Sequence, residues 1–577
     1  MTDITKTNSN AEDVAAFILE NTGPSALDVP APKSVSPKVS NPDAELEITD
    51  IQEEKPAVIL SRTEFILVFV GLALAVFISA LDQTIVAVAL QAIAAEFKSL
   101  DKINWIGTAF FLTATAFIPV YGQLADVFGR KLTFLLAIGI FEFGSLLCGV
   151  ATSMDMLIVA RGVAGMGGAG VFSLTMIIIG DLTTTRDRGQ YLGLIGSTYG
   201  LASIAGPLLG GVFVDHVTWR WVFYINLPIG LITVAAVLRF LRFQAPEHES
   251  FYGSLKKIDW LGTVLLVSAV ICILIPIQSG GSTYAWNSPT VIVLFIVGFL
   301  LFGIFLFVEG RVAKNPVLPF ALFKNQYASA TFATSFFVGA AFFILVFYCP
   351  LWFQIVLGVS ATQAGIHTLP LMMGMVFSSI LSGATATSTG YFFPFLPAGA
   401  IITALGAGLL TTLTEDASLA KQIIFMLIAG LGVGAGFQMC IVSAQVSVKP
   451  NLLAAVTSTN NFIQTIGLAI GIAICSSLFN TNLPNNIADA LTSYGLSEIQ
   501  LLGNASSAIV YQDSSVLHNS LYIVPGSDLQ KALVHGYLET LRTLFWLPMG
   551  FSLVWCVTCL FVKKDKIAQG TEISMGA

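Results

Sequence analysis

Three ionisable side chains lie deep within long apolar runs of this chain: Asp82, Glu142 and Arg161. A charged group at the centre of a membrane helix costs at least about 2.5–3.5 kcal/mol, so each of the three needs a partner or a wet cavity. Two roles are open for Asp82 and Arg161. They form either a proton-sensitive network whose protonation accompanies a conformational change, or a static ion pair that joins two helices. For Glu142 we favour the simpler interpretation of a protonated, hydrogen-bonded packing residue.

A second charged feature is the stretch GQLADVFGRK, from Gly122 to Lys131, which separates two apolar runs. Gly122 and Gly129 permit a close helix approach and a tight turn. Asp126, Arg130 and Lys131 supply charges of both signs within one short segment, so an ion network there can hold one conformation and release it in another. We predict that this segment is a cytosolic gating loop.

The composition indicates a membrane protein. Of the 577 residues, 55% are hydrophobic and only 11% are charged, and the mean hydropathy is +0.82. Soluble domains carry about 25% charged residues. The apolar blocks are about 18 to 25 residues long, which suits helices that cross roughly 30 Å of hydrocarbon, whereas a membrane β-barrel would show blocks of about ten alternating residues.

Several function classes are disfavoured. Neither the seven cysteines nor the five histidines have the spacing of a disulfide framework or a metal site. The chain contains no P-loop motif, which argues against an ATP-driven pump, and the GMGGAG run that begins at Gly165 falls inside an apolar block, so we assign it to helix packing. We expect no enzyme activity, no cofactor, no metal and no nucleic-acid partner.

The apolar blocks predict fourteen membrane-spanning helices. These helices start near Phe65, Trp105, Leu132, Met156, Leu192, Val222, Trp260, Pro289, Ala328, Leu369, Phe393, Gln422, Leu452 and Leu544.

The positive-inside rule predicts that both ends of the chain are cytosolic, because about 20 of the 27 Lys and Arg residues then lie on the cytosolic side. Residues 1–60 carry 11 acidic and 4 basic side chains, which predicts a solvated, disordered tail. A long loop from about Asn480 to His535 then faces the opposite side. Its sequon at Asn504 is a predicted glycosylation site.

We expect five parts along the chain. They are an acidic cytosolic tail (1–61), a six-helix bundle (62–243), a linker with inserted helices seven and eight (244–325), a second six-helix bundle containing the long loop (326–563), and a cytosolic tail (564–577).

The GQLADVFGRK segment resembles the loop signature of the major facilitator superfamily, and further signatures follow in order. LIVARGVAGMGGAG, from Leu157 to Gly170, resembles the buried-arginine motif of that superfamily, with Ala164 in place of the usual glutamine. Three more segments resemble signatures of its fourteen-span drug:proton antiporter family. They are LDQTIVAVAL (Leu81–Leu90), WRWVFYINLPIG (Trp219–Gly230) and IDWLG (Ile258–Gly262).

The predicted fifth span resembles the glycine and proline pattern of proton-coupled antiporters, with Ala202 where the middle glycine is expected. We favour a hinge or packing seam there, because Pro207 removes a backbone hydrogen bond. Close packing of small residues without a role in coupling is the alternative. The residues that match the pattern are Gly193, Gly206, Pro207, Gly210 and Gly211.

An internal repeat supports a division into two bundles. GATATSTG, from Gly383 to Gly390, has the glycine spacing of GQLADVFG, but Thr387 replaces Asp126 and Tyr391 replaces Arg130. If spans seven and eight are an inserted pair, the chain divides as 6+2+6, and the two turns take equivalent places in two parallel bundles around a central site.

A polar stripe marks the predicted thirteenth span. Thr457, Asn460, Asn461 and Gln464 follow helical spacing and share one face. Such a stripe either lines a polar cavity or bonds to a neighbouring helix. Asn461 and Gln464 are the better candidates for substrate contact.

The resemblance implies an all-α polytopic membrane protein with the major facilitator fold, whose two bundles rock around a midplane cavity. It implies secondary active transport by proton antiport of amphipathic organic compounds, with Asp82 and Arg161 as the proton-coupling pair. The alternatives are a vacuolar antiporter of basic amino acids, an exporter of a secreted metabolite, a passive channel and a transporter-like receptor. We expect a monomer in the plasma membrane, or else in the vacuolar membrane, with a small-molecule substrate, protons and the lipid bilayer as its partners.

Overall fold

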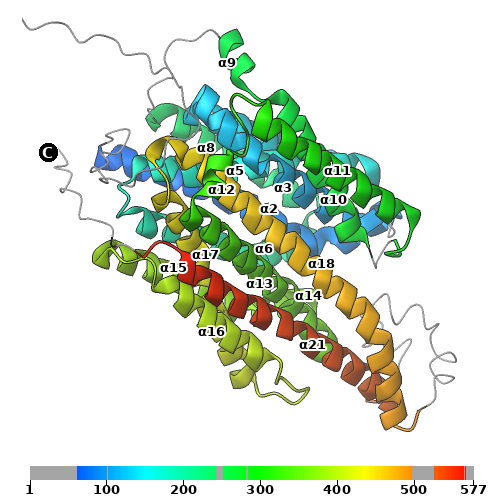
Figure 1. Cartoon of the computed structure of the whole chain (residues 1–577). Coiled ribbons are helices and arrows are strands. Elements are labelled where there is room, and N and C mark those ends of the chain that lie inside the picture. Colours follow the sequence, from blue (N-terminus) through cyan, green and yellow to red (C-terminus); the bar gives the residue numbers. More distant parts are fainter. Residues whose placement is uncertain are drawn as a thin grey trace, which may run out of the picture. The chain divides into compact units, whose positions relative to one another are not determined.

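The structure is a computed structural model that describes residues 61–99, 102–241, 251–280, 284–496, 526–564 and 566. Within these ranges the chain is built from helices (Figure 1), and the paired β residues there are an isolated bridge between Gly280 and Tyr284. The predicted disorder of residues 1–60 and the predicted glycosylation site at Asn504 lie outside the described residues.

Polar caps begin many of the helices, as expected where backbone N–H groups at a helix start need acceptors. The side chain of Ser61 accepts a hydrogen bond from the backbone of Glu64 and completes a capping box at the first described helix. Asp259, Ser288 and Ser527 cap later helices with their own side-chain oxygens. The apolar blocks of the sequence therefore fold as helices between polar start signals.

The first group of helices is centred on α5, which has 78% of its most apolar stretch buried. Helix α5 packs against α3 and α4, while α2 packs against α6 and α8. Small residues of α5 allow this central position, because they let neighbouring backbones approach closely. The group comprises α2 (Arg62–Phe97), α3 (Ile103–Phe128), α4 (Arg130–Gly149), α5 (Met154–Leu182), α6 (Arg188–His216), α7 (Trp221–Tyr224) and α8 (Asn226–Phe240).

Two long helices follow as a hairpin, α10 and α11. Helix α10 also contacts α3, whereas α11 is only 22% buried and is the more peripheral of the two. The segment comprises α9 (Phe251–Lys257), α10 (Trp260–Ser279), α11 (Pro289–Arg311) and α12 (Phe320–Lys324).

In the second group, α13 packs against α18 and α21, and α15 and α16 both pack against α17. Figure 1 shows α15, α16, α17, α13 and α21 side by side in the lower part of the view. The group comprises α13 (Gln326–Val356), α14 (Ala361–His367), α15 (Leu369–Thr389), α16 (Phe395–Leu410), α17 (Leu419–Val446), a 3-10 turn (Pro450–Leu452), α18 (Leu453–Ser493), α21 (Asp528–Thr558) and a second 3-10 turn (Cys559–Phe561).

Thirteen helices of the described residues are long and apolar enough to cross a membrane, which confirms a multi-pass membrane protein. The eleventh predicted span is the exception, because α16 has only 16 residues. At 1.5 Å per residue such a helix covers about 24 Å, less than the roughly 30 Å of hydrocarbon.

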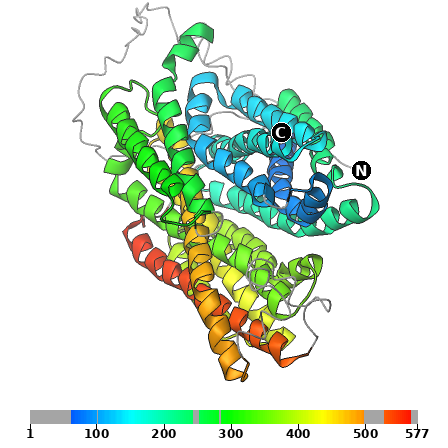
Figure 2. The same cartoon turned by 90° about the vertical axis from the view of Figure 1, so that its right-hand side faces the viewer.

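The long loop predicted from about Asn480 to His535 is wrong at both edges. Helix α18 continues to Ser493, and α21 begins at Asp528, well before the predicted start near Leu544. Figure 2 shows the two helices together, α18 in orange and α21 in red. They stay packed past the apolar stretch, where Asn486 donates a hydrogen bond to Thr540 over 2.9 Å and Ile487 is buried. Polar residues such as Asn486 end the apolar block of α18, but the helix itself continues through them to Ser493.

The two groups meet along two seams, α6 with α15 and α3 with α18. We call the end of the helices that carries Gly129 and Gly390 the turn end. The membrane side that it faces and the predicted domain limits stay predictions. This pairing places helices far apart in sequence on either side of one interface.

Candidate functional site

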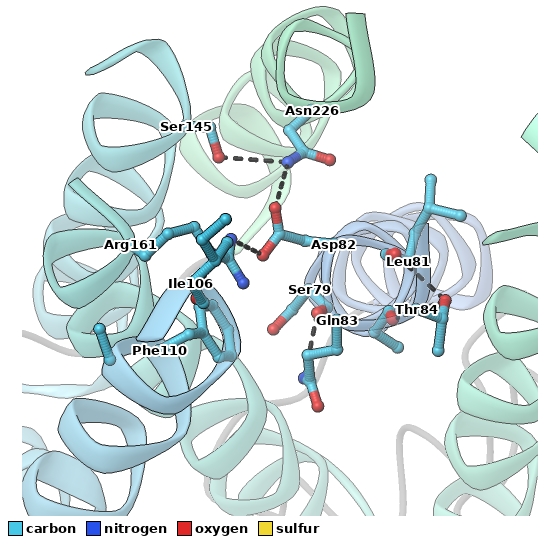
Figure 3. Close-up of polar contacts among 12 residues, drawn as sticks. Ser79, Leu81, Asp82, Gln83, Thr84, Ile106, Phe110, Ser145, Arg161 and Asn226 are labelled. Carbon is cyan, nitrogen blue, oxygen red and sulfur yellow. Dashed lines mark hydrogen bonds and ion pairs between the residues drawn. The ribbon is translucent and has the colours of Figure 1, made fainter. Parts of the chain in front are cut away.

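Asp82 and Arg161 form a buried ion pair between α2 and α5 (Figure 3). Nη1 of Arg161 lies 2.5 Å from Oδ2 of Asp82. Asp82 is 0% exposed and Arg161 is 1% exposed, so the two charges neutralise each other away from solvent. A buried pair of this kind keeps its charges only because each has the other and further hydrogen bonds. The structure thus brings together the two residues proposed from sequence for proton coupling.

Further contacts fix the Arg161 guanidinium. Its Nε donates a 3.2 Å hydrogen bond to the carbonyl oxygen of Ile106, and its charge lies 4.5 Å from the centre of the Phe110 ring. Gly165 makes this approach possible, because an added Cβ would stand 2.3 Å from the Phe110 carbonyl oxygen. The glycines of the buried-arginine motif therefore let α3 reach the arginine.

Asn226 extends the pair to two more helices, as Figure 3 shows. Its Nδ2 lies 3.3 Å from Oδ1 of Asp82 and 3.1 Å from Oγ of Ser145. The contacts join α2, α5, α8 and α4 in one polar network. Sequence analysis missed Asn226 and Ser145. Asn226 had a usable signal, since it is an amide inside the apolar segment WRWVFYINLPIG.

Gln83, next to Asp82, links the same helix to α6. The hydroxyl of Tyr199 donates a 3.2 Å hydrogen bond to Oε1 of Gln83, and Nε2 of Gln83 bonds to the carbonyl oxygen of Ser79 at 3.1 Å. A change in the position of α2 would thus alter its hydrogen bond with α6. Sequence analysis did not single out either residue.

At the turn end, Arg130 holds two carboxylates. Its Nη1 lies 3.1 Å from Asp126 and its Nε lies 2.7 Å from Asp181 at the end of α5. Lys131 instead donates a 2.9 Å hydrogen bond to the carbonyl oxygen of Leu238 in α8. The predicted ion network of the turn is present, and Asp181 is its missed member.

The two glycines of this turn have separate roles. Gly129 ends α3 with φ of 84°, a left-handed conformation that favours glycine. Gly122 lies against α18, since an added Cβ would stand 2.2 Å from Oγ of Ser458. A cavity of about 510 Å³ opens beside the turn and is lined by Gln123, Asp126 and residues of α9, of the segment before α12 and of the start of α18.

The second glycine turn shares two features with the first, a positive φ at its last glycine and close packing at its first. Gly390 ends α15 with φ of 78°, and a Cβ on Gly383 would stand 2.3 Å from the carbonyl oxygen of Gly189 in α6. The two turns share a positive φ at the glycine that ends the helix, but ψ is 156° at Gly129 and 2° at Gly390, and the equivalence of the two turns stays a prediction. Arg186, which sequence analysis missed, donates hydrogen bonds to the carbonyl oxygens of Thr387 and Ser388 at 2.7 and 2.6 Å.

The small residues of α6 face two neighbours. A Cβ on Gly193 would stand 2.5 Å from the carbonyl oxygen of Ser379 in α15, and one on Gly206 would stand 2.2 Å from Oγ1 of Thr84 in α2. Pro207 lies inside α6, which remains one continuous helix. Gly210 lies against Ile85, and Gly211 is half-buried. Close packing is visible at this motif, and its role in coupling stays a prediction.

The polar stripe of α18 is buried throughout. Asn460 accepts a 2.6 Å hydrogen bond from Ser335 in α13, so it bonds to a neighbouring helix. Both side-chain polar atoms of Asn461 and Nε2 of Gln464 have no hydrogen-bond partner among the described residues. The same holds for both polar atoms of Gln438 in α17, which sequence analysis missed. Unpaired buried amides are costly unless water or a ligand satisfies them.

Glu96 and Arg220 connect α2 to the WRWVFYINLPIG segment at the opposite end. Arg220 Nη2 lies 2.9 Å from Glu96, and Nε1 of Trp219 donates a 2.6 Å hydrogen bond to the same carboxylate. Glu96 lies past Leu90, where the membrane-spanning part of α2 ends. The hydrogen bond from Arg220, followed by that from Trp219, lowers the pKa of Glu96 below its ordinary value.

Glu142, left out of the predicted site, has no hydrogen-bond partner for either carboxylate oxygen among the described residues. The predicted packing role with a hydrogen bond is therefore incomplete. Across the described ranges we find no group of three or more His, Cys, Asp and Glu side chains placed to hold a metal ion.

Residues 72–472 match the family model described as Major Facilitator Superfamily. The chain is 40% identical to the MFS-type efflux pump MFS1 of Arthroderma benhamiae over 423 residues, which cover 73% of this chain and 79% of that protein. It is 37% identical to the efflux pump aflT of Aspergillus parasiticus over 74% of this chain and 84% of that protein. The MFS-type transporter phomT of Diaporthe leptostromiformis is 37% identical over 90% of this chain and 86% of its own length.

Solved structures share the fold at low identity. The human organic anion transporter MFSD10 aligns with a TM-score of 0.52 and 14% identity, covering 86% of this chain and 100% of that one. A bacterial homologue of the human lysosomal transporter Spinster aligns with a TM-score of 0.51 and 16% identity, covering 87% of this chain and 98% of that one.

Proposed function

Because this chain belongs to the major facilitator superfamily and is a multi-pass membrane transporter, we propose that it exports amphipathic organic compounds by proton antiport. The export direction is supported by relatives that are named efflux pumps. Alternating access of the two helix groups carries the substrate, and proton movement down its gradient drives it.

The buried Asp82–Arg161 pair is the observation that carries the proton coupling. Protonation of Asp82 removes its charge and with it the attraction that holds Nη1 of Arg161 at 2.5 Å. The consequence is not local, because Asn226 and Ser145 tie the same carboxylate to α8 and α4. One proton at Asp82 would thus loosen contacts among four helices.

Alternating access is supported by the hydrogen bonds between the two groups near the turn end. Besides those of Arg186, the hydroxyl of Ser379 in α15 donates a 3.2 Å bond to Gly193 in α6. Gln445 in α17 donates a 3.4 Å bond to Met176 in α5. These bonds keep the groups together at this end, and rocking requires that they break.

The unpaired amides of Asn461, Gln464 and Gln438 are the proposed substrate contacts. Neutral donors and acceptors among apolar helices suit an amphipathic compound better than a highly charged one. A basic amino acid would need a free carboxylate, and Asp82 is already paired with Arg161. The unpaired neutral amides therefore favour an amphipathic compound over a basic amino acid. We propose that the exporter lies in the plasma membrane and acts as a monomer.

The test uses purified protein in liposomes with an imposed pH difference, and transport of ethidium and of arginine is measured with and without that difference. We expect ethidium movement that depends on the gradient in wild type and is lost in Asp82→Asn. Asp155→Asn is the matched control, since Asp155 pairs with Lys102 at an exposed site over 2.7 Å.

Ethidium flux that ignores the gradient would indicate a passive channel and overturn the proposal. Gradient-driven arginine transport without ethidium transport would replace the substrate class. A tagged protein that lies at the vacuolar rim rather than at the cell surface would overturn the proposed location.

A further inference from the structure

Glu142 is a buried acid that the proposed mechanism does not use. It lies on α4, one helical turn before Ser145, and both of its carboxylate oxygens lack a hydrogen-bond partner among the described residues. Its Oε1 is held against the backbone of α8, because a Cβ on Gly230 would stand only 1.9 Å away. An ionised carboxylate in such a place would be costly, since nothing there compensates the lost hydration.

Glu142 also lies beside the Asp82 network. Gly230 is one turn beyond Asn226 on α8, and Ser145 is one turn beyond Glu142 on α4. The contact between Asn226 and Ser145 is therefore followed along the same two helices by the contact between Gly230 and Glu142. Glu142 is therefore one helical turn away from the contacts that hold Asp82.

The charges of this region do not balance if both acids are ionised. Arg161 supplies one positive charge, and it is already paired with Asp82. Two ionised carboxylates would leave one net negative charge inside the membrane, whereas one bound proton makes the region neutral. Oδ1 of Asn226 could accept a hydrogen bond from a protonated carboxyl group, because it is buried without a partner among the described residues.

Other titratable groups near α4 lie further along the helices. Helix α4 packs against α3, α5, α7 and α8. On α4 itself Cys148 lies beside Arg161, and on α7 Tyr224 lies against Gly149. The remaining charged residues of α4, of these neighbours and of their N-caps lie toward helix ends, and they are Arg130, Lys131, Lys102, Asp126, Asp155, Asp181, Arg220 and Arg239.

We propose that Glu142 is a second proton-binding residue of the Asp82 network, and that it carries the proton in this conformation. The proposal rests on the proton coupling proposed above and adds Glu142 as the residue that holds the proton before it reaches Asp82. When the proton passes to Asp82, Arg161 is released from Asp82 and pairs with Glu142 instead. The O–H bond of Glu142 breaks and an O–H bond on Asp82 forms. Glu142 becomes the carboxylate, and the total charge of the region is unchanged.

Infrared spectroscopy of the purified protein tests the site without any transport. The difference spectrum of wild type minus Glu142→Gln should contain the carbonyl band of a protonated carboxylic acid, identified by its shift in D2O. In Asp82→Asn, Glu142 is the carboxylate of the described network that remains to pair with Arg161. We therefore expect it to ionise, and the band should be lost at the same pH.

Transport in liposomes gives the functional arm. Glu142→Gln should lose ethidium transport driven by the pH gradient but keep ethidium counterflow, which needs no proton. Glu309→Gln is the matched control, because Glu309 is a buried acid of α11 that accepts a 2.9 Å bond from the backbone of Val317. It should keep both activities.

The outcomes separate the two proposals. No acid band in the difference spectrum, or a band that survives in Asp82→Asn, overturns the inference about Glu142. A band that depends on Asp82, together with wild-type transport that ignores the gradient, overturns the proposed function instead. If Glu142→Gln does not reach the membrane, Glu142→Asp keeps an acid that is one methylene shorter, and its band should shift.

Discussion

Arg186, in the segment between α5 and α6, donates from Nε to the carbonyl oxygen of Thr387 at the end of α15 over 2.7 Å. A cation from one helix group thereby caps the negative end of a helix from the other group. Together with the bond from the backbone N–H of Gln190 to Oγ1 of Thr387, this side chain holds α6 against α15 at the turn end, although the second glycine turn lacks the charges of the first.

Replacing Arg186 should favour opening of the turn end. Arg186→Ala removes both hydrogen bonds to α15, whereas Arg186→Lys keeps the charge and one donor. We expect a cysteine introduced at the buried Ser458 to be labelled faster by a membrane-permeant thiol reagent in the alanine variant, with lysine in between. Equal rates in all three proteins would contradict a role in closure.

Gly122→Val should hold α3 away from α18. An added Cβ would stand 2.2 Å from Oγ and 2.8 Å from Cβ of Ser458, so the side chain cannot be accommodated without movement. We expect loss of ethidium transport with protein abundance retained. Ser458→Gly removes the obstacle and should restore transport in the double variant, and failure of that rescue would point to a different cause.

Breaking the buried pair should destabilise the protein strongly. Arg161→Gln leaves Asp82 buried without its cation, and loss of one partner of a buried pair costs about 3–5 kcal/mol. The double variant Asp82→Asn, Arg161→Gln has no uncompensated charge, so it should unfold at a higher temperature than Arg161→Gln alone. Thermal unfolding in detergent gives the comparison, and additive losses would argue against the pair.

The contact of Glu96 with Arg220 and Trp219 predicts a dependence of stability on pH. The pKa of Glu96 is lower in the folded protein than its ordinary value of 4.5. Its contribution is therefore present above that value and is lost as the pH falls through the lower pKa of the folded state. The difference in unfolding temperature between wild type and Glu96→Gln should shrink from pH 7 toward pH 3.

The amides of α18 should separate affinity from stability. Asn461→Ala with Gln464→Ala should weaken apparent ethidium affinity by about tenfold, as expected for loss of about 1.4 kcal/mol of hydrogen bonding. Asn460→Ala should instead lower the unfolding temperature, since Asn460 bonds to Ser335. Unchanged affinity and substrate range in the first variant would rule out a cavity role.

The sequence alone predicts most of the helices, because a membrane-spanning helix needs a long apolar block and few charges. It also predicts the Asp82–Arg161 pair, since two opposite charges in hydrocarbon need partners. The same rule fails where a helix leaves the apolar region. Helix α18 runs through Asn486 to Ser493 because it packs on α21, and that contact is between distant segments.

Residues that act through distant partners were the ones missed. Asp181, Arg186 and Asn226 are ordinary in composition, and their roles depend on which helix lies opposite. Glu142 shows the converse case. Its burial was predictable, but the lack of a partner for its carboxylate depends on Gly230 lying against it.

The first glycine of each turn lies against a helix of the other group. Gly122 receives α18 and Gly383 receives α6, so each half holds a groove cut for a helix of the other. If each half tilts as a rigid body, separation of Gly122 from α18 is accompanied by separation of Gly383 from α6. The turn end should therefore have two conformations, closed and open, with intermediate conformations little populated.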